Sequence, residues 1–262
     1  HLDCENNLIE SLEPLRGAPL GQLNFGLNQV ASLGPLSGMP LIALNLGHNP
    51  VSTLEPLRGM RLLRLQMADT RLSDLEPLRG MALRRLTCQN TEVSDLEVLR
   101  GMPLTWLEVQ HTRVEDLEPV SAAPLRRLRC DRAPIRSLEP LLHSPPFIFH
   151  FECSTLTDDE LRRAAAVWSS NPEHAVHARN ARLYLARRAR DWKSIRKMGL
   201  HFRGHRYLYL PYPMLWSDAQ EFCDTLGGYL ACITSEDEHR FLESMVPEEE
   251  HGWIGLHRSG SA

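Results

Sequence analysis

Apolar residues recur in a fixed order along the first part of the chain. A leucine opens the pattern at seven positions with a strict spacing of 21 residues: Leu12, Leu33, Leu54, Leu75, Leu96, Leu117 and Leu138. Counting that leucine as position 1, the other apolar residues fall at positions 4, 9, 12, 14 and 19 of each repeat. Seven copies without a slip exclude chance, and a repeat of this length predicts units that stack side by side.

Each repeat contains two kinds of local pattern. Positions 12 and 14 alternate with polar residues, which predicts a short half-buried strand. The opening predicts a tight helical turn, with proline near its start and glycine at its end in most copies. The residue before each opening leucine can cap that turn with a side-chain oxygen: Ser11, Ser32, Thr53, Asp74, Asp95, Asp116 and Ser137.

One repeat cannot bury its own apolar edge, so the repeats are expected to stack into a curved solenoid with strands on the concave side. Position 17 is a polar ladder that we expect to hydrogen-bond the loop backbone of adjacent repeats: Asn7, Asn28, Asn49, Thr70, Thr91 and Thr112. The ladder ends at Ala133, and Phe149, Phe151 and Leu156 continue the core positions of a degenerate eighth repeat. These aromatic residues predict the start of a cap.

The motif L-x-x-L-x-L-x-x-[N/T]-x-[V/I/L] resembles the leucine-rich repeat over about Leu2 to Leu156. The resemblance implies an α/β leucine-rich repeat solenoid of 21-residue repeats, which we assign to residues 1–156. Cys4, Cys88 and Cys130 all occupy position 14, so we interpret them as core side chains without a disulfide, metal or redox role. The near-identity of the repeats is typical of large bacterial multidomain proteins.

Residues 157–198 are expected to form a helical cap or linker. Thr157 followed by Glu160 predicts a capping box at the start of one helix. A second helix is predicted with one apolar face made of Ala178, Ala181, Leu185, Ala189 and Trp192. Both helices are expected to close the end of the solenoid.

The region from His174 to Leu200 carries eight Lys or Arg residues against one acid, Asp191. A nucleic-acid or membrane patch is one interpretation, and a solvated helix face is the one we favour. His174 and His177 are three residues apart and could share a metal ion, but no matching Cys or carboxylate cluster accompanies them. We therefore interpret them as surface histidines.

Residues 199–262 carry a second resemblance. Their ordered motif resembles the N-terminal half of a C-type lectin-like domain: Trp216, Ala219, Phe222, Cys223, Leu226, Gly227, Gly228, Leu230, Ile233, Ser235, Glu238, Phe241 and the run Trp253-Ile254-Gly255-Leu256. It implies a truncated α+β C-type lectin-like domain. Locally, Ser217 is expected to cap a helix ended by Gly227, and Ser235 a second helix with Glu238 in its first turn.

In that family the residues that hold calcium and sugar follow the matched segment, so the resemblance implies no cofactor within this chain and calcium only in a completed domain. It also implies a disulfide partner for Cys223 beyond Ala262, and hence an extracellular or cell-surface location. Cys232 is expected in the core.

The concave strand face holds the candidate partner-binding residues. Positions 11, 13 and 15 should point outward from it, and there the candidates are Arg64, Arg85, Trp106, Glu108, Arg127 and Arg129. Trp and Arg are the residue types that most often anchor protein interfaces. The alternative is a solvated face in which the guanidinium groups stack over Trp106. These residues include no acid–base pair, nucleophile set or metal cluster, so the face is a poor catalytic surface.

Composition excludes some classes of function. The 262 residues are 42% hydrophobic and 24% charged, with a formal net charge of -4, which is ordinary for a globular protein and argues against a nucleic-acid partner. No apolar run is long enough to span a membrane. Because the pattern is already under way at His1, without an initiator Met, the chain is expected to be a fragment. We also expect it to be a monomer.

The leading hypothesis is a non-enzymatic recognition module that binds a protein or glycan through the concave solenoid face, with carbohydrate as a further ligand of the lectin-like domain. The alternative is the recognition arm of a larger enzyme, such as a Ser/Thr protein kinase, whose catalytic domain precedes residue 1. Calcium-dependent sugar binding is a third hypothesis, which residues beyond Ala262 would decide.

Overall fold

A computed structural model describes residues 1–151, 155–210, 216–245 and 253–258. Its internal contacts divide the chain into an N-terminal unit, His1–Glu160, and a C-terminal unit, Leu161–Ala262, and each is described by itself. None of the helices in these described ranges has the length and apolar character needed to cross a membrane.

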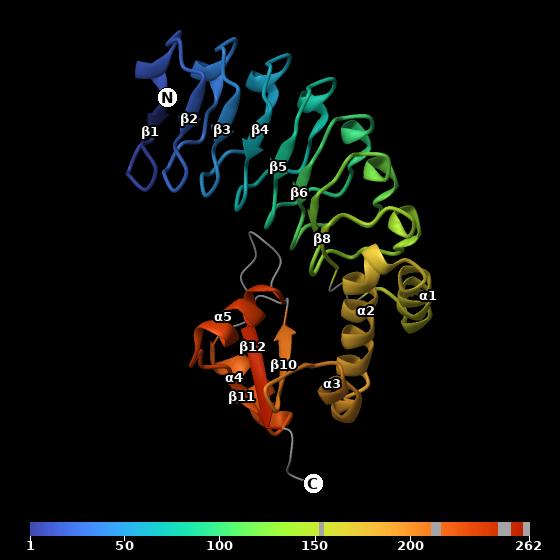
Figure 1. The fold of residues 1–262 in the computed structure, drawn as a ribbon. Helices are drawn as coiled ribbons and strands as arrows, with labels where there is room; N and C mark the ends of the chain where they lie inside the picture. The colour runs from blue at the N-terminus through green and yellow to red at the C-terminus, as the bar shows by residue number, and fades with distance from the viewer. Residues whose placement is uncertain (152–154, 211–215, 246–252, 259–262) are drawn as a thin grey trace. The chain divides into compact units, whose positions relative to one another are not determined.

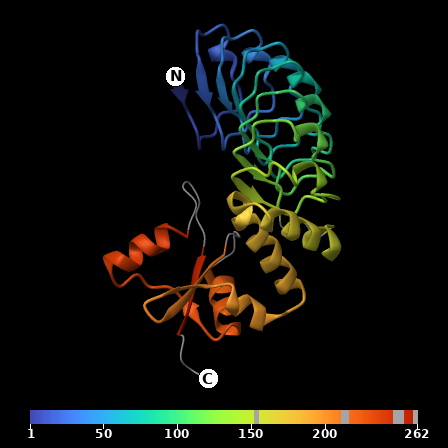
Figure 2. The same cartoon turned by 45° about the vertical axis from the view of Figure 1, so that its right-hand side comes forward.

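The N-terminal unit is built on an eight-stranded parallel sheet whose strands follow chain order (Figures 1 and 2). Every pairing joins equivalent residues of successive repeats, as Gln22 with Ala43 and Ala43 with Arg64. The strands are β1 (Leu2–Asp3), β2 (Gln22–Asn24), β3 (Ala43–Asn45), β4 (Arg64–Gln66), β5 (Arg85–Thr87), β6 (Trp106–Glu108), β7 (Arg127–Arg129) and β8 (Ile148–His150). The predicted solenoid of parallel strands is therefore confirmed.

Seven short 3-10 helices form the opposite side of the solenoid. They are η1 (Glu13–Leu15), η2 (Gly34–Leu36), η3 (Glu55–Leu57), η4 (Glu76–Leu78), η5 (Glu97–Leu99), η6 (Glu118–Val120) and η7 (Glu139–Leu141). In every one, the predicted capping oxygen accepts a hydrogen bond from the backbone N–H two residues further along the chain. The shortest bond, 2.7 Å, joins Glu97 N to Asp95 Oδ1, and the longest, 3.3 Å, joins Gly34 N to Ser32 Oγ. The capping prediction is confirmed in all seven repeats.

Glycine ends these turns only where the chain needs a positive φ. After η1, Arg16 has φ -54° and ψ 123° and Gly17 has φ 73°, the geometry of a type II turn, which favours glycine at its third residue. After η6 the glycine is replaced, and Ser121 takes the right-handed helical conformation instead, with φ -61° and ψ -34°. The sequence difference therefore changes the turn type.

The position-17 ladder has two chemical halves. The Asn49 Nδ2 group donates to three carbonyls, those of Phe25, Leu46 and Gly47, while its Oδ1 accepts from Val30 N at 2.9 Å. Asn28 makes the same kind of bonds across to the preceding repeat. Among the described residues, the threonine hydroxyls donate to carbonyls of their own repeat, as Thr91 Oγ1 does to the Cys88 carbonyl. The expected inter-repeat bonds are thus confirmed for the buried asparagines and wrong for the threonines.

Position 16 is a ladder of left-handed residues that the sequence pattern did not reveal. Seven successive repeats place a non-glycine residue there with φ between 52° and 59°: Asn6, Leu27, His48, Asp69, Asn90, His111 and Arg132. Asparagine and aspartate tolerate this region better than other L-residues, because their short polar side chains can hydrogen-bond locally. Leu27 has no such compensation.

Replacing Leu27 with asparagine is expected to raise the stability of the N-terminal unit by about 1 kcal/mol, since it removes the steric cost of a branched side chain in the left-handed region. The urea midpoint of unfolding measures the gain. Leu8, which is 81% exposed and is not left-handed, provides the matched control, because Leu8→Asn removes a surface leucine without changing backbone strain. Equal effects of both substitutions would contradict the explanation.

The core of the N-terminal unit is made of the repeated apolar positions. Cys88 is a fully buried free thiol and Cys130 is fully buried, and the thiol of each is directed at a carbonyl oxygen of the next strand. Burial raises the pKa of Cys88 to about 12, so its thiolate is not formed at neutral pH. Cys4 is also free but only partly buried. Phe149, Phe151 and Leu156 are buried, as the degenerate eighth repeat predicted.

The C-terminal unit combines helices with a small antiparallel sheet. Its helices are α1 (Asp158–Ser169), which begins just before the unit boundary, η8 (Pro172–His174), α2 (Ala175–Arg188), α3 (Trp192–Lys197), α4 (Trp216–Thr225) and α5 (Glu236–Glu243). Its strands are β9 (Leu200–Phe202), β10 (His205–Leu210), β11 (Tyr229–Leu230) and β12 (Trp253–Arg258), in the spatial order β11-β12-β10-β9.

The capping box of α1 is confirmed. Thr157 Oγ1 accepts from Glu160 N at 3.2 Å, and Glu160 Oε2 accepts from Thr157 N at 3.0 Å. The predicted second helix is shorter than expected, because α2 ends at Arg188 and the left-handed residue Arg190 separates it from α3, which Trp192 begins. Ala189 is consequently exposed.

The expectation of surface histidines is wrong for His177. It is 4% exposed, and its ring meets the fully buried Trp168 edge to face, with centroids 5.8 Å apart. A histidine is apolar enough at its ring edge to serve as a core residue when an aromatic neighbour packs on it.

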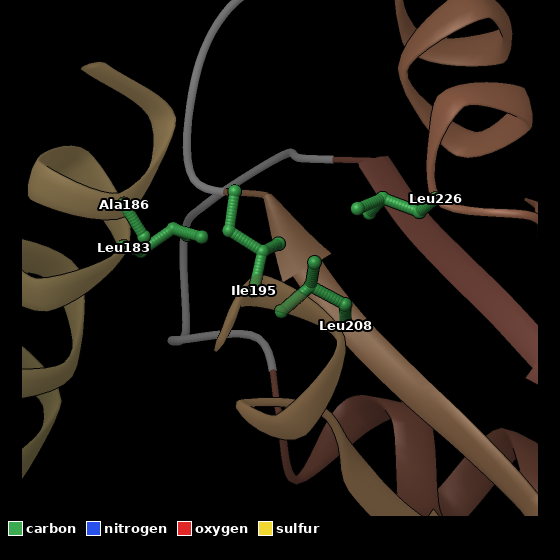
Figure 3. Close-up of a cluster of buried hydrophobic side chains, with 5 residues drawn as sticks. All are labelled: Leu183, Ala186, Ile195, Leu208 and Leu226. Carbon is green, nitrogen blue, oxygen red and sulfur yellow. The ribbon is translucent and has the colours of Figure 1, made fainter. Parts of the chain in front are cut away.

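Helices α2 and α3 share a hydrophobic core with the segment that resembles a lectin domain. Figure 3 shows Leu183 and Ala186 directed from α2 towards Ile195, with Leu208 of β10 and Leu226 beside them. Trp192 packs on the same cluster and meets Phe222 of α4 edge to face, at 6.1 Å between ring centroids. The two helices therefore belong to the C-terminal unit, and the expected cap of the solenoid stays a prediction. The boundaries 1–156, 157–198 and 199–262 stay predictions.

Three details of the C-terminal unit test local expectations. Helix α4 begins at Trp216, so Ser217 lies inside its first turn, and Gly227 ends it with φ 69°. Ser235 caps α5 as predicted, because its Oγ accepts from Glu238 N at 3.2 Å. Cys223 is buried, but Cys232 is exposed, so the core placement expected for Cys232 is wrong. Cys153 lies outside the described residues.

Candidate functional site

The open face of the parallel sheet contains a hollow of about 540 Å³. Its lining comes from strands β2 to β6, from the loops that follow them, and from His1 and Glu5 on either side of β1. Successive repeats place equivalent side chains next to each other along the sheet. Four of the six predicted partner-binding residues line it: Arg64, Arg85, Trp106 and Glu108. Arg127 and Arg129 lie on the next strand, β7.

The N-terminal part of the hollow is small and rich in amides. Asn45 turns its Oδ1 towards Gly47 N, at 3.1 Å, and Asn24 does the same for Gly26 N. A side chain at Gly47 would bring its Cβ to 3.1 Å from the Ala68 carbonyl oxygen, so the floor must stay bare. The Asn45 amide NH2 group consequently faces an open floor without a hydrogen-bond partner among the described residues.

Two arginines stand next to each other in the middle of the hollow. Arg64 of β4 is in register with Arg85 of β5, and both side chains are exposed. Within the described ranges, neither guanidinium forms an ion pair, although Arg85 lies over the Trp106 ring at 4.8 Å. Their positive charges are therefore turned towards the hollow.

Trp106 lies between two guanidinium groups at the far end of the hollow. Arg85 precedes it in the sheet and Arg127 follows it, with guanidinium carbons 4.8 and 4.3 Å from the ring centroid. The predicted alternative, a cation–π stack of guanidinium groups over Trp106, is therefore present, and it holds the ring in a fixed position. The arrangement leaves the ring edge, rather than an open ring face, for a partner.

Glu108 and Arg127 are buried, so the expectation that every outward strand position is exposed is wrong for them. Each is 9% exposed, and Arg127 Nε lies 3.2 Å from Glu108 Oε1. Arg129 Nε lies 3.8 Å from Asp131 Oδ2, two residues further along the same repeat, and Asp131 is also buried. The charged residues predicted as one site thus divide into an exposed pair, Arg64 and Arg85, and a buried network.

A second hollow, of about 340 Å³, lies in the C-terminal unit and was not predicted from the sequence. Its buried base is Glu238, which accepts from Thr234 N, Thr234 Oγ1 and Tyr207 Oη, the last at 2.7 Å. These bonds, first those from Thr234 and then that from Tyr207, hold the pKa of Glu238 below its usual range. All of them are made within the fold, so the carboxylate serves the architecture of this hollow.

Among the described residues, no three His, Cys, Asp or Glu side chains gather in a group that could hold a metal ion. The described residues therefore do not provide the group of carboxylates that a calcium site needs.

Residues 212–262 match the family model described as Lectin C-type domain. Struthiocalcin-2 of Struthio camelus is 41% identical over 70 residues, covering 22% of this chain and 49% of that protein. Mouse C-type lectin domain family 4 member F is 33% identical over 73 residues, covering 28% of this chain and 12% of that protein. The chain therefore spans half or less of the length of these curated relatives.

The solenoid has a solved structural neighbour. An internalin (inlF) from Listeria monocytogenes superposes with a TM-score of 0.57 at 22% sequence identity, covering 62% of this chain and 50% of the internalin chain. At this identity the similarity concerns the fold alone. The chain is thus similar to internalins in its leucine-rich repeat solenoid and to C-type lectin domains in its C-terminal segment.

Proposed function

We propose that this chain is a non-enzymatic recognition module that binds a protein partner in the hollow of the solenoid sheet, with Arg64, Arg85 and Trp106 as contact residues. The observation that supports the proposal most directly is the hollow itself, which gathers polar side chains from five strands. Trp and Arg are enriched among residues that dominate binding energy. Glu108, Arg127 and Arg129 act in this proposal by holding Trp106 in place.

A second recognition function is supported by the lectin-type match at residues 212–262. We propose that this segment contributes carbohydrate recognition, and a chelator comparison is the test of calcium dependence. The hypothesis of a recognition arm for an enzyme rests on sequence outside this chain.

The concave site can be tested by a substitution that fills the hollow and leaves the net charge unchanged. Ala43→Trp places a large side chain on β3, next to Arg64. Arrays of secreted proteins and of glycans would be probed with the parent chain and the variant, with and without chelator. We expect protein signals to fall by about tenfold or more in Ala43→Trp, because a blocked pocket removes the central contacts of an interface.

Thermal unfolding of both proteins provides the control for folding. Protein signals that survive Ala43→Trp unchanged would contradict binding in the hollow. Glycan signals that are unchanged in Ala43→Trp would be assigned to the C-terminal segment. If chelator removes these signals, glycan binding depends on a metal ion.

A further inference from the structure

Arg64 and Arg85 are an unusual pair within the solenoid. They lie directly opposite each other on neighbouring parallel strands, about 4.8 Å apart at the backbone, where like charges destabilise a sheet. Six other arginines of the unit are matched by an acid: Arg16 with Glu13, Arg58 with Glu55, Arg79 with Glu76, Arg100 with Glu97, Arg113 with Glu92 and Arg136 with Glu115. The exposed pair in the hollow has no such match among the described residues.

The acids that share the hollow do not neutralise this pair. The Glu5 carboxylate accepts from Asn24 Nδ2 at 2.9 Å, and Glu108 lies against Arg127 in the buried network. Both carboxylates are therefore engaged elsewhere. The centre of the hollow keeps two positive charges that only a bound group can compensate.

We propose that Arg64 and Arg85 form an anion-binding pair and that its ligand is an acidic polypeptide segment, with side-chain carboxylates placed between the two guanidinium groups. This inference rests on the proposed function and specifies the chemistry of the partner. Charge-assisted bonds from arginine to carboxylate are the strong hydrogen bonds of protein interfaces, and two adjacent guanidinium groups offer them to the same ligand. Binding would also remove the repulsion between the strands.

The shape of the hollow favours a peptide over a glycan. Strands β2 to β6 span about 19 Å at ordinary strand spacing, which an extended peptide of about six residues covers. Trp106 has guanidinium groups over its ring and does not offer the open aromatic face that a sugar ring would stack on. The free NH2 group of Asn45 adds a donor suited to a peptide carbonyl.

The experiment uses the full chain and a fluorescent peptide of about six glutamates, the length that spans the hollow. Anisotropy would be measured with this peptide, with a glutamine peptide of equal length, and with a sulfated heparin oligosaccharide. The test variant is Arg64→Gln with Arg85→Gln. Its matched control is Arg61→Gln with Arg71→Gln, which changes the net charge equally at exposed arginines outside the hollow.

We expect the glutamate peptide to bind the parent and to bind the Arg64/Arg85 variant at least about tenfold more weakly, with a change below about twofold in the control. The glutamine peptide should not bind, and added salt should weaken binding because the contact is ionic. No binding of the glutamate peptide to the parent would overturn the proposal, as would equal losses in both double variants. Preferential binding of heparin with the same dependence on Arg64 and Arg85 would assign the site to a glycan instead.

The same variants separate this inference from the proposed function. If the array partners are lost in Ala43→Trp but retained when Arg64 and Arg85 become glutamine, the hollow binds a partner that is not acidic, and only the inference fails. If Ala43→Trp has no effect on those partners, the proposed function itself fails.

Discussion

Asn49→Ala is expected to lower the free energy of unfolding of the N-terminal unit by about 4 kcal/mol. The side chain is 3% exposed and satisfies four backbone groups: the carbonyls of Phe25, Leu46 and Gly47 and the N–H of Val30. The Phe25 carbonyl also accepts from Asn28 Nδ2, and the Gly47 carbonyl also accepts from Leu27 N. Two of the four groups, the Leu46 carbonyl and the Val30 N–H, would therefore be left without a bond. A buried polar group without a partner costs about 1–3 kcal/mol.

Two further variants locate the origin of that loss. Thr91→Val is nearly isosteric and removes a single bond, from Thr91 Oγ1 to the Cys88 carbonyl, so its cost should be about 1 kcal/mol. Asn49→Thr introduces the residue type that the later repeats use and should fall between the two. Urea unfolding gives the three free energies. Native-state hydrogen exchange of the Val30 amide should accelerate in both Asn49 variants, because its acceptor is lost.

An equal loss in Asn49→Ala and Thr91→Val would contradict this account, because it would show that bonds to the neighbouring repeat add nothing. The ladder would then be a set of independent turns. The expected ranking instead makes the N-terminal repeats, which carry Asn28 and Asn49, more strongly coupled than the repeats that carry threonine.

Local patterns accounted for most of the solenoid because each repeat obeys the same short-range rules. The oxygen of Ser11 or Asp74 reaches a backbone N–H only two residues away, so sequence spacing alone places it. The burial of Phe149 follows from the same periodicity. These contacts depend on neighbours in sequence, which a repeat pattern specifies.

What the sequence pattern missed depends on distant neighbours. Whether Glu108 is exposed is decided by Arg127 on the next strand, and α2 packs on Leu208 and Leu226, which lie far from it in the sequence. The helical spacing of apolar residues predicted one helix from Ala178 to Trp192, because that spacing contains no sign of the left-handed turn at Arg190. The left-handed backbone at position 16 was also not predictable from residue type, because Leu27 and Arg132 adopt it although their side chains disfavour it.

Because part of the candidate site is buried, substitutions there are expected to change the stability of the N-terminal unit. Arg127→Ala is expected to lower the free energy of unfolding of the N-terminal unit by about 3 kcal/mol, because removing one partner of a buried pair leaves Glu108 buried without its counter-charge. The variant also withdraws a guanidinium group from the Trp106 ring. Arg64→Ala, at an exposed position without an ion pair among the described residues, should stay within about 0.5 kcal/mol of the parent.

A double variant shows whether the lost charge balance is the cause. Arg127→Met with Glu108→Met replaces the pair by apolar side chains of similar length, and such replacements of buried ion pairs are often neutral. It should therefore unfold closer to the parent than Arg127→Ala does, as measured by urea midpoints. If the double variant is instead less stable than Arg127→Ala, the pair contributes more than its charge balance. If Arg127→Ala unfolds like Arg64→Ala, the buried network does not support the sheet, and Arg127 returns to the set of residues that a partner could contact.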